Sequence, residues 1–544
     1  MTATKSLWAW GDAARFPDDA ARRRLAQAAR ALTGGAEPTL RPLPDEAAAQ
    51  IPAGRLTAAA APAALAPLLS DLPRDRAAHA YGRGYPDLIR GFAGDFAAAP
   101  DLIARPRSAT DVAALLDWCS AARLAAIPYG GGTSVVGGVE LPAAARADFA
   151  GVVTLDLEHL ADVAEVDATS LAARIGAGMR GPALEAALAA HGLTLRHYPQ
   201  SFAFSTLGGW LATRAGGHFA TGPTHIDDFC EALTVVTPRG TIATRRLPAS
   251  GAGPAPERLW LGSEGALGVI TDAWMRVQRR PRWRAGATIK FRSFTAGAAA
   301  ARALAQSGLQ PANCRLLDPA ECLLHQVAFD GTAVMILGFE SADHPLGPWL
   351  ERALELVRDA GGTVASGPTY ADELAADTDE PGRAAEAGSW RKAFVDAPYL
   401  QSALVSLGIL ADTFETACTW DRFAEFHRAV TAATTDALRR TVGGGLVACR
   451  LTHVYPDGAA PYYTFVAPTR VGDELAVWRE VKAAASEALL AAGGTITHHH
   501  AVGRVHHPWY QRERDPLFGA ALAAVKRELD PAGILNPGVL VAGC

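Results

Sequence analysis

The sequence predicts an α+β protein in which two main domains follow a helical N-terminal arm, and three observations carry this prediction. Residues 1–98 are rich in Ala, Arg and Pro and show helical periodicity without an alternating strand pattern. Residues 99–282 mix short strands and helices with three loops rich in glycine and hydroxyl side chains. From about residue 285, strands and helices alternate as in an antiparallel sheet with helices on one face.

Composition is ordinary for a soluble globular protein and argues against nucleic acid as a partner. Of the 544 residues, 49% are hydrophobic and 20% charged, and the net charge of -5 lacks the basic excess typical of nucleic-acid-binding proteins. The seven cysteines never form a C-x-x-C pair, which argues against a disulfide framework or a zinc ribbon. Because no run of 18 apolar residues and no signal-peptide pattern occurs, we expect no transmembrane segment and a cytoplasmic location.

The first elements form a strand, a helix and a second strand. Helical periodicity around Asp18–Leu32 predicts a helix in the arm. Beyond it, the strand Leu102–Ala104, the helix Asp111–Ala122 with Ser108 as its cap, and the strand Ala125–Ile127 follow in order. We expect this βαβ unit to deliver a phosphate-binding loop.

That loop consists of Pro128, Tyr129, Gly130, Gly131, Gly132, Thr133 and Ser134. Three successive glycines permit positive φ angles and let several N–H groups point at one anion, which a pyrophosphate requires. No Lys follows the glycines as in a P-loop, and the spacing is not G-x-G-x-x-G. Taken alone, the loop is better interpreted as a structural turn.

Two further loops rich in glycine and hydroxyl side chains follow along the chain, and they strengthen the prediction of a nucleotide-binding site. Strands at Val152–Leu157 and Leu171–Ile175 and a helix at Pro182–His191 come first. The second loop, residues 199–209, runs into Trp210–Arg214. The sequence then predicts a strand pair at 233–244 and a third loop at 262–271.

The second domain is expected to be an antiparallel cap. Its predicted elements are the strand Thr288–Phe291, helix Ala298–Gln306, strands Arg315–Leu317 and Ala333–Glu340, helices Trp349–Ala360 and Ala424–Leu438, strands Leu446–Tyr455 and Tyr462–Ala467, helix Glu474–Leu490 and the strand-like Thr495–His500. The acidic, Ala-rich segment Pro368–Gly388 predicts a mobile loop. The sequence predicts a last helix at Phe518–Leu529, which ends at Asp530-Pro531. We expect the helix and the compact turn after it to form a clasp that closes the fold.

Three consecutive histidines, His498, His499 and His500, are candidates for chemistry. In an extended chain, alternate side chains face the same way, so at least one of them should face a bound cofactor. Imidazoles can hydrogen-bond an oxygen anion and transfer protons near pH 7. The alternative is an exposed polar patch.

Eight motifs in order resemble the vanillyl-alcohol oxidase/PCMH superfamily of FAD enzymes, specifically its alkyldihydroxyacetonephosphate synthase branch. They are PYGGGTS (128–134), PQSFAFSTLGGW (199–210), TRAGG (213–217), GSEGALGVIT (262–271), DTFETACTWDR (412–422), CRLTHVYPDGAAPYYTF (449–465), THHHAVGR (497–504) and DPAGILNPG (530–538). The resemblance implies a two-subdomain PCMH-type FAD-binding domain at 99–282 and a cap domain of the FAD-linked oxidase C-terminal type at 283–495. A C-terminal active-site strand and clasp at 496–544 would return to the FAD domain.

In this family the first four motifs bind FAD. The resemblance therefore assigns cofactor binding to Pro128, Tyr129, Gly130, Gly131, Gly132, Thr133, Ser134, Pro199, Gln200, Ser201, Phe204, Ser205, Thr206, Gly208, Gly209, Thr213, Arg214, Ala215, Gly216, Gly262, Glu264, Gly265, Gly268, Val269 and Ile270. Relatives with covalent FAD commonly place a His in the glycine loop. This loop has none, so we expect non-covalent FAD.

The resemblance also bears on a metal. The D-lactate-type dehydrogenases of the superfamily bind a metal ion through two His residues seven positions apart on one strand. In this chain the corresponding strand begins at His453. Position 460 is Ala. We therefore predict no metal, although the three consecutive histidines invite a metal site.

Tyr462 matches the family's catalytic tyrosine, which accepts and donates a proton at the carbon that meets flavin N5. A phenol has an ordinary pKa near ~10, so it needs basic neighbours, and Arg450 and the histidines are candidates. The resemblance assigns catalysis to Tyr462, His498, His499 and His500, and substrate binding to Gln401, Thr413 and Arg450. The alternative is that Tyr462 is a core residue of a strand.

Two departures from the family concern the substrate. The family has an Arg-Asp pair after Pro-Tyr-Leu, whereas Gln401 and Ser402 follow here. A neutral amide cannot make the bidentate, charge-assisted contact that guanidinium makes with phosphate. Ala203 also stands where the family usually has an acidic residue. Both changes leave the FAD prediction untouched.

Three functions remain as hypotheses. In the first, a synthase-like flavoenzyme, an alkoxide replaces an acyl group of a small substrate through chemistry at flavin N5, without net redox change. In the second, an FAD-linked oxidase or dehydrogenase acts on a non-phosphorylated alcohol or 2-hydroxy acid. The third is a flavin-binding module without turnover. A homodimer is an open alternative to the monomer.

Overall fold

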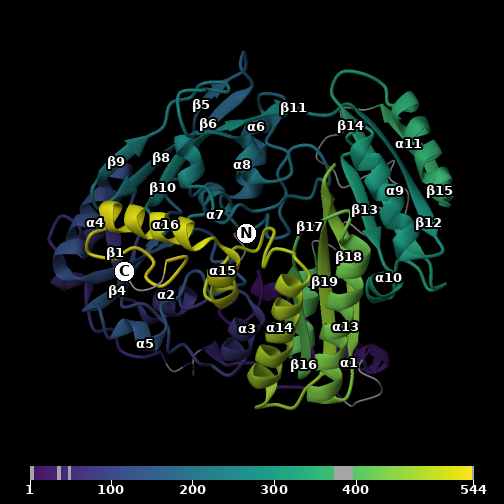
Figure 1. The fold of residues 1–544 in the computed structure, drawn as a ribbon. Helices are drawn as coiled ribbons and strands as arrows, with labels where there is room; N and C mark the ends of the chain where they lie inside the picture. The colour runs from purple at the N-terminus through teal and green to yellow at the C-terminus, as the bar shows by residue number, and fades with distance from the viewer. Residues whose placement is uncertain (1–4, 33–37, 47–48, 50, 373–395, 542–544) are drawn as a thin grey trace.

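The protein consists of two bodies that lie side by side, as the computed structural model shows (Figure 1). The structure describes residues 5–32, 38–46, 49, 51–372 and 396–541. One body holds the sheets built from residues 102–276, and the other holds one long antiparallel sheet built from residues 283–468. The predicted α+β class is confirmed.

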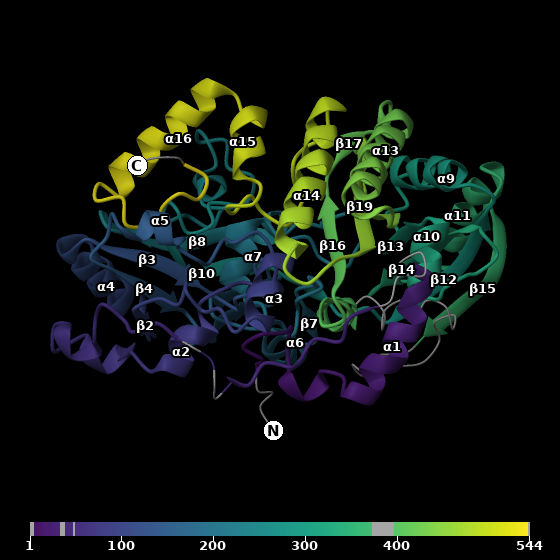
Figure 2. The ribbon, with the colours of Figure 1, turned by 90° about the horizontal axis from the view of Figure 1, so that it is seen from below.

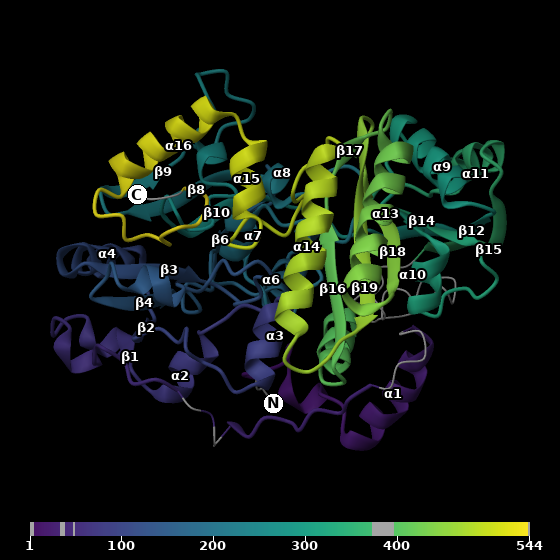
Figure 3. The ribbon, with the colours of Figure 1, turned by 60° about the horizontal axis from the view of Figure 1, so that its bottom comes forward.

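The N-terminal arm is helical, as predicted, and runs beneath both bodies (Figure 3). Its helices are α1 (Asp19–Leu32), α2 (Pro73–Ala78) and α3 (Tyr85–Phe92). The sequence does not predict the short strand β1 (Leu69–Ser70), which pairs antiparallel with β2 (Leu102–Ala104). The arm therefore adds a strand to the first body.

The arm also contacts the second body. In α1, Ala26 and Ala29 pack against Leu404, Leu407 and Ile409. Since these small and aliphatic side chains are buried together, the arm is held at both of its ends.

The first body begins with a parallel βαβ unit, which confirms the prediction. Strands β2, β4 (Gly151–Asp156) and β3 (Leu124–Tyr129) lie in this spatial order, with β3 at the sheet edge. Helix α4 (Ala109–Ala122) connects β2 to β3, and its cap Ser108 accepts a hydrogen bond from the Asp111 amide. The strands are buried on both faces, which explains their continuous apolar runs.

A five-stranded antiparallel sheet completes this body. Its spatial order is β5-β6-β10-β8-β9, with bounds Val163–Asp167, Ala172–Gly176, Val269–Arg276, Cys230–Thr237 and Gly240–Ala243. Helices α6 (Gly181–Ala189), α7 (Leu207–Thr213) and α8 (Ile226–Phe229) and a small sheet of β7 (Leu193–Thr194) and β11 (Gln278–Arg279) accompany it. The predicted strand pair at 233–244 corresponds to β8 and β9.

The second body is the antiparallel cap that the sequence predicts. Its strands follow the order β15-β12-β14-β13-β18-β19-β16, with bounds Thr363–Asp372, Trp283–Phe291, Ala333–Ser341, Asn313–Leu317, Leu446–Val454, Gly458–Pro468 and Ile409–Glu415; β17 (Cys418–Thr419) pairs with β19. Figure 2 shows its long helices on one face of the sheet. These are α9 (Phe294–Gln306), α11 (Gly347–Asp359), α13 (Phe423–Val442) and α14 (Glu474–Ala491), and the short α10 (Pro319–Leu324) is nearby.

The structure corrects two predictions about this body. Residues 495–500 form no strand and follow a bent path. Residues 368–372, the start of the predicted mobile loop, belong to strand β15, while 373–388 lie outside the described residues.

The C-terminal segment returns to the first body (Figure 3). After α15 (His507–Glu513) and α16 (Pro516–Leu529), the Ala126 amide of β3 donates to the Ile534 carbonyl, and the Asn536 amide donates to the Ala126 carbonyl. Within the described ranges, no helix combines the length and apolarity needed to cross a membrane. The domain limits at 98, 282 and 495 stay a prediction.

Candidate active site

One cavity lies between the two bodies and gathers most of the predicted site residues. Glycine-loop residues line one side, and residues of β16, β18, β19 and the histidine segment line the other. Of the predicted site residues, only Phe204, Arg214, Gly262 and His498 do not line it. All three loops and the predicted substrate residues thus face one space.

Close packing explains the glycines of the first loop. A Cβ atom on Gly131 would lie 2.0 Å from the Phe204 carbonyl oxygen, and Gly132 has a φ of +63°. Because a side chain fits neither position, the first loop can approach the second one closely. The two loops form a cradle of bare backbone that suits a diphosphate.

The third loop is tied to the C-terminal segment through Glu264. Its buried carboxylate accepts hydrogen bonds from the Val502 amide (2.9 Å) and the Gly503 amide (2.8 Å). Burial raises the pKa of Glu264 to about 7, although these bonds and Arg504 oppose the rise. The loop therefore depends on the segment that follows the histidines.

Tyr462 lies on β19 with the neighbours that the sequence suggests. Its hydroxyl donates to Thr413 Oγ1 at 3.0 Å, and the Arg450 guanidinium lies 3.8 Å from its ring centroid. The rings of His499 and His500 are 5.9 and 5.5 Å away. Burial raises the pKa of Tyr462, and the Arg450 charge opposes this by favouring the phenolate.

The histidine segment is organised by one buried carboxylate, Glu415. Its Oε2 accepts from the amides of His498 (2.6 Å) and His499 (3.1 Å), and its Oε1 accepts from the His500 amide (2.9 Å) and Thr497 Oγ1 (2.6 Å). Glu415 also pairs with Tyr462 across β16 and β19. The expected extended path is wrong because this carboxylate, and not a neighbouring strand, binds the backbone amides.

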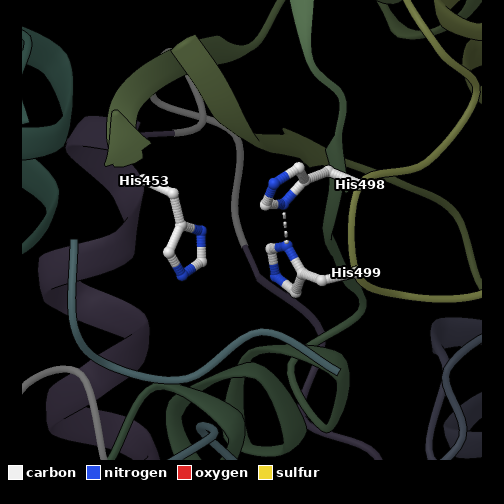
Figure 4. Close-up of side chains that lie close together, drawn as sticks. All are labelled: His453, His498 and His499. Carbon is white, nitrogen blue, oxygen red and sulfur yellow. Dashed lines mark hydrogen bonds between the residues drawn. The ribbon is translucent and has the colours of Figure 1, made fainter. Parts of the chain in front are cut away.

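The histidines form a cluster with His453 from β18 (Figure 4). One nitrogen from each of His453, His498 and His499 lies within 4.8 Å of the others, and His498 Nδ1 is 3.0 Å from His499 Nδ1. His453 Nε2 donates to the Gly217 carbonyl at 2.9 Å. Burial lowers the pKa of these three histidines, which favours neutral imidazoles at pH 7.

His498 does not line the cavity and instead contacts residues behind the other rings. Its Nε2 lies 2.8 Å from the Tyr455 hydroxyl and 3.0 Å from His225 Nε2. Three neutral imidazoles this close could also bind a metal ion, and the prediction of no metal stays a prediction.

Gln401 lies beside a carboxylate. Its Nε2 donates to the Ala411 carbonyl at 2.9 Å and lies 3.4 Å from Asp412 Oδ1. Asp412 Oδ2 accepts from Trp478 Nε1 at 2.7 Å and is 3.7 Å from Lys482 Nζ. A phosphate next to Gln401 would meet this negative charge.

Sequence reasoning misses several lining residues. Lys482 on α14, Arg83 beside α3 and Trp10 in the arm reach the cavity from segments without a motif. Asp412 opens a motif that the sequence analysis quotes, but it is given no role there. His453 is named there only as an isolated histidine.

Two family models match the chain, the FAD binding domain over residues 100–245 and the C-terminal domain of FAD linked oxidases over residues 280–540. An alkyldihydroxyacetonephosphate synthase from Caenorhabditis elegans is 30% identical over 488 residues, covering 87% of this chain and 81% of the relative. The corresponding enzyme of Trypanosoma brucei brucei is 28% identical over 476 residues, covering 86% and 77%.

Solved structures share the fold. A structure of an alkyldihydroxyacetonephosphate synthase aligns with a TM-score of 0.79 at 23% identity, covering 98% of each chain. A 4-ethylphenol oxidase from Gulosibacter chungangensis aligns with a TM-score of 0.60 at 15% identity, covering 81% of this chain and 89% of the other.

Proposed function

The chain belongs to the alkyldihydroxyacetonephosphate synthase family of FAD-dependent enzymes, and from this premise we propose that it exchanges an acyl group for an alkoxide on a small oxygenated substrate. In this exchange the acyl group leaves as a carboxylate, the incoming alcohol loses a proton, and no net oxidation occurs. The observation that carries the proposal is one cavity lined by the glycine loops, Tyr462, Arg450, His499 and His500.

The proposed roles follow from the contacts of each residue. The three glycine loops would hold FAD, which would supply an isoalloxazine ring able to react with a substrate carbon. Tyr462 takes and returns the proton at that carbon, because its hydroxyl lines the cavity and Arg450 favours its phenolate. Neutral His499 and His500 accept the proton of the incoming alcohol, and Thr413 orients the Tyr462 hydroxyl.

The contacts of Gln401 favour a second candidate function. An oxidase or dehydrogenase of a non-phosphorylated hydroxylated substrate would not need the family Arg that Gln401 replaces. Asp412, 3.4 Å from the Gln401 amide, would also disfavour a phosphate there. In this function Tyr462 or a histidine would take the hydroxyl proton as the substrate is oxidised.

An anaerobic absorption spectrum separates the two functions. We expect acyl-exchange substrates to leave the flavin oxidised after turnover, because the proposed reaction has no net redox change. Lasting bleaching of the flavin absorption by an alcohol or 2-hydroxy acid would instead establish the oxidase or dehydrogenase.

We predict that FAD is released when the purified protein is precipitated with acid. No histidine occurs in the loop of residues 128–134 to attach the flavin covalently. All yellow colour should appear in the supernatant, as measured by absorbance. A washed pellet that keeps its colour would contradict the prediction.

Gln401→Arg is predicted to bind the phosphorylated ketone acyl-dihydroxyacetonephosphate about tenfold more tightly than wild type. A hydrogen bond to a charged group contributes about 1.5–3 kcal/mol. Asp412 lies beside this position and will offset part of the positive charge of the new guanidinium, which reduces the gain in binding free energy. Gln401→Met serves as the neutral control of similar length. Titration followed by the flavin spectrum measures both affinities. Tight wild-type binding that Gln401→Arg leaves unchanged would show that this position does not select against phosphate.

A further inference from the structure

The start of the N-terminal arm reaches the glycine loop. Residues 5–12 turn back on themselves, with the Ser6 amide donating to the Gly11 carbonyl at 2.9 Å. Lys5 Nζ donates to the Gly131 carbonyl at 2.6 Å and to the Tyr129 hydroxyl at 3.0 Å. The ammonium group of Lys5, a residue of the arm, therefore contacts the glycine loop that forms the diphosphate cradle.

A second cation, Arg83, lies against the same loop and lines the cavity. Its side chain is 5% exposed, its Nη1 donates to the Gly82 carbonyl (2.6 Å) and its Nη2 to the Ser6 carbonyl (2.9 Å). Its backbone amide donates to the Ser134 carbonyl at 2.6 Å, at the end of the glycine loop. The Nε atom is buried without a hydrogen-bond partner among the described residues.

Neither cation is neutralised within the described part of the chain. Every hydrogen-bond acceptor named for Lys5 and Arg83 is a carbonyl or a hydroxyl, and no carboxylate of a described residue lies within 4.0 Å of either. Asp156 and Glu158 act on Lys5 from a greater distance, but His79 contacts Asp156 and Arg105 contacts Glu158. Asp87 acts on Arg83 in the same way, but its carboxylate is paired with Arg90. Burial and mutual repulsion lower the pKa of Lys5.

A buried cation without a counter-ion is costly, and Arg83 is such a cation at the cavity wall, whereas Lys5 is half-buried and reaches the site through the Gly131 carbonyl. A ligand anion at this place would stabilise both side chains. The first loop offers backbone N–H groups but contains no basic residue. We propose that the N-terminal arm is part of the FAD site, and that Lys5 and Arg83 neutralise the cofactor diphosphate that the glycine loop holds. The arm would thus supply the charge that a P-loop takes from its own lysine.

The arm also connects this position to the cap. The Trp10 amide donates to Ser402 Oγ at 3.1 Å, the Asp12 amide donates to the Tyr399 hydroxyl at 3.2 Å, and Trp10 lines the cavity. The arm therefore links the glycine loop to the segment that carries Gln401.

The test compares FAD and riboflavin binding to the full-length protein. Riboflavin carries the same ring without phosphates, so a cation that acts on the diphosphate affects FAD alone. For Lys5→Met we expect FAD to dissociate from the holoenzyme about tenfold faster, with a weaker dependence on NaCl concentration than in wild type. Riboflavin affinity of the reconstituted protein should stay unchanged. Lys290→Met, which removes an exposed lysine paired with Asp330 on the cap, is the control.

Flavin fluorescence measures dissociation, and thermal unfolding verifies the fold. Arg83→Lys keeps the charge at a buried position and should retain FAD better than Arg83→Gln, even if the latter folds poorly. Unchanged FAD dissociation and salt dependence in Lys5→Met would overturn the proposal. Equal weakening of FAD and riboflavin would also overturn it, because the arm would then act only as a structural support. Since the readout is cofactor retention, failure here leaves the proposed reaction untouched.

Discussion

Turnover of Tyr462→Phe is expected to fall by ~10²- to 10⁴-fold, the usual contribution of a general acid or base, while FAD stays bound. The substitution removes only the hydroxyl, which lines the cavity and donates to Thr413. The ring, its packing against Arg450 and its neighbours on β19 are retained. Steady-state kinetics and the flavin spectrum of the purified variant measure the two effects.

The adjacent Tyr463 provides a matched control. It is also fully buried on β19, but its hydroxyl lies 3.2 Å from His427 Nδ1 and not in the cavity. Tyr463→Phe should therefore change turnover little. A near-normal rate for Tyr462→Phe would show that Tyr462 is a packing residue of the strand.

Glu415→Gln is expected to lower turnover by on the order of 10²-fold, because misplacing a catalytic group by about 1 Å has an effect of this size. The neutral amide replaces one acceptor oxygen by an NH₂ group, which would face the backbone amides of the histidines. These amides are held by both carboxylate oxygens, so the rings of His499 and His500 would shift relative to Tyr462. FAD should be retained, since Glu415 makes no contact with the glycine loops. Glu425→Gln, on the exposed face of α13, is the control.

The same variant should differ from wild type in the pH dependence of stability. Burial disfavours the charge of Glu415, but the positive charges that His500 and His498 carry once protonated at low pH, together with the hydrogen bond from Thr497, outweigh it and lower its pKa from 4.5 to about 2. A carboxyl group with a lowered pKa stabilises the folded state above its unfolded pKa, and this contribution disappears as pH falls through the folded value. The difference in melting temperature between wild type and Glu415→Gln should therefore shrink between about pH 4.5 and pH 2. A constant difference over this range, or normal turnover, would mean that Glu415 does not position the histidines.

Local patterns allowed much of the fold to be predicted. The βαβ unit follows from the apolar runs at β2 and β3 and from Ser108, which caps α4, because these signals lie within a few residues of their effect. The glycine loops and Tyr462 were found through motifs, and the structure brings them to one cavity. Their roles in binding and catalysis stay predictions.

Long-range contacts could not be predicted. Glu415 lies 83 positions before His498, and no local pattern indicates that its carboxylate replaces a strand partner. Lys482 belongs to an ordinary helix and Arg83 to the turn before α3, and only the folded chain brings them to the cavity. The charged residues that distant segments bring to a site cannot be predicted from the periodicity of the local sequence.

The return of the C-terminal segment to β3 has a consequence for synthesis on the ribosome. Because β3 is the edge strand of the four-stranded sheet, only the bridge between Ala126 and Leu535 covers its open side among the described residues. About 400 residues must emerge after this strand before the bridge can form. A nascent chain therefore exposes an apolar sheet edge until translation is almost complete, and exposed edges of this kind promote aggregation.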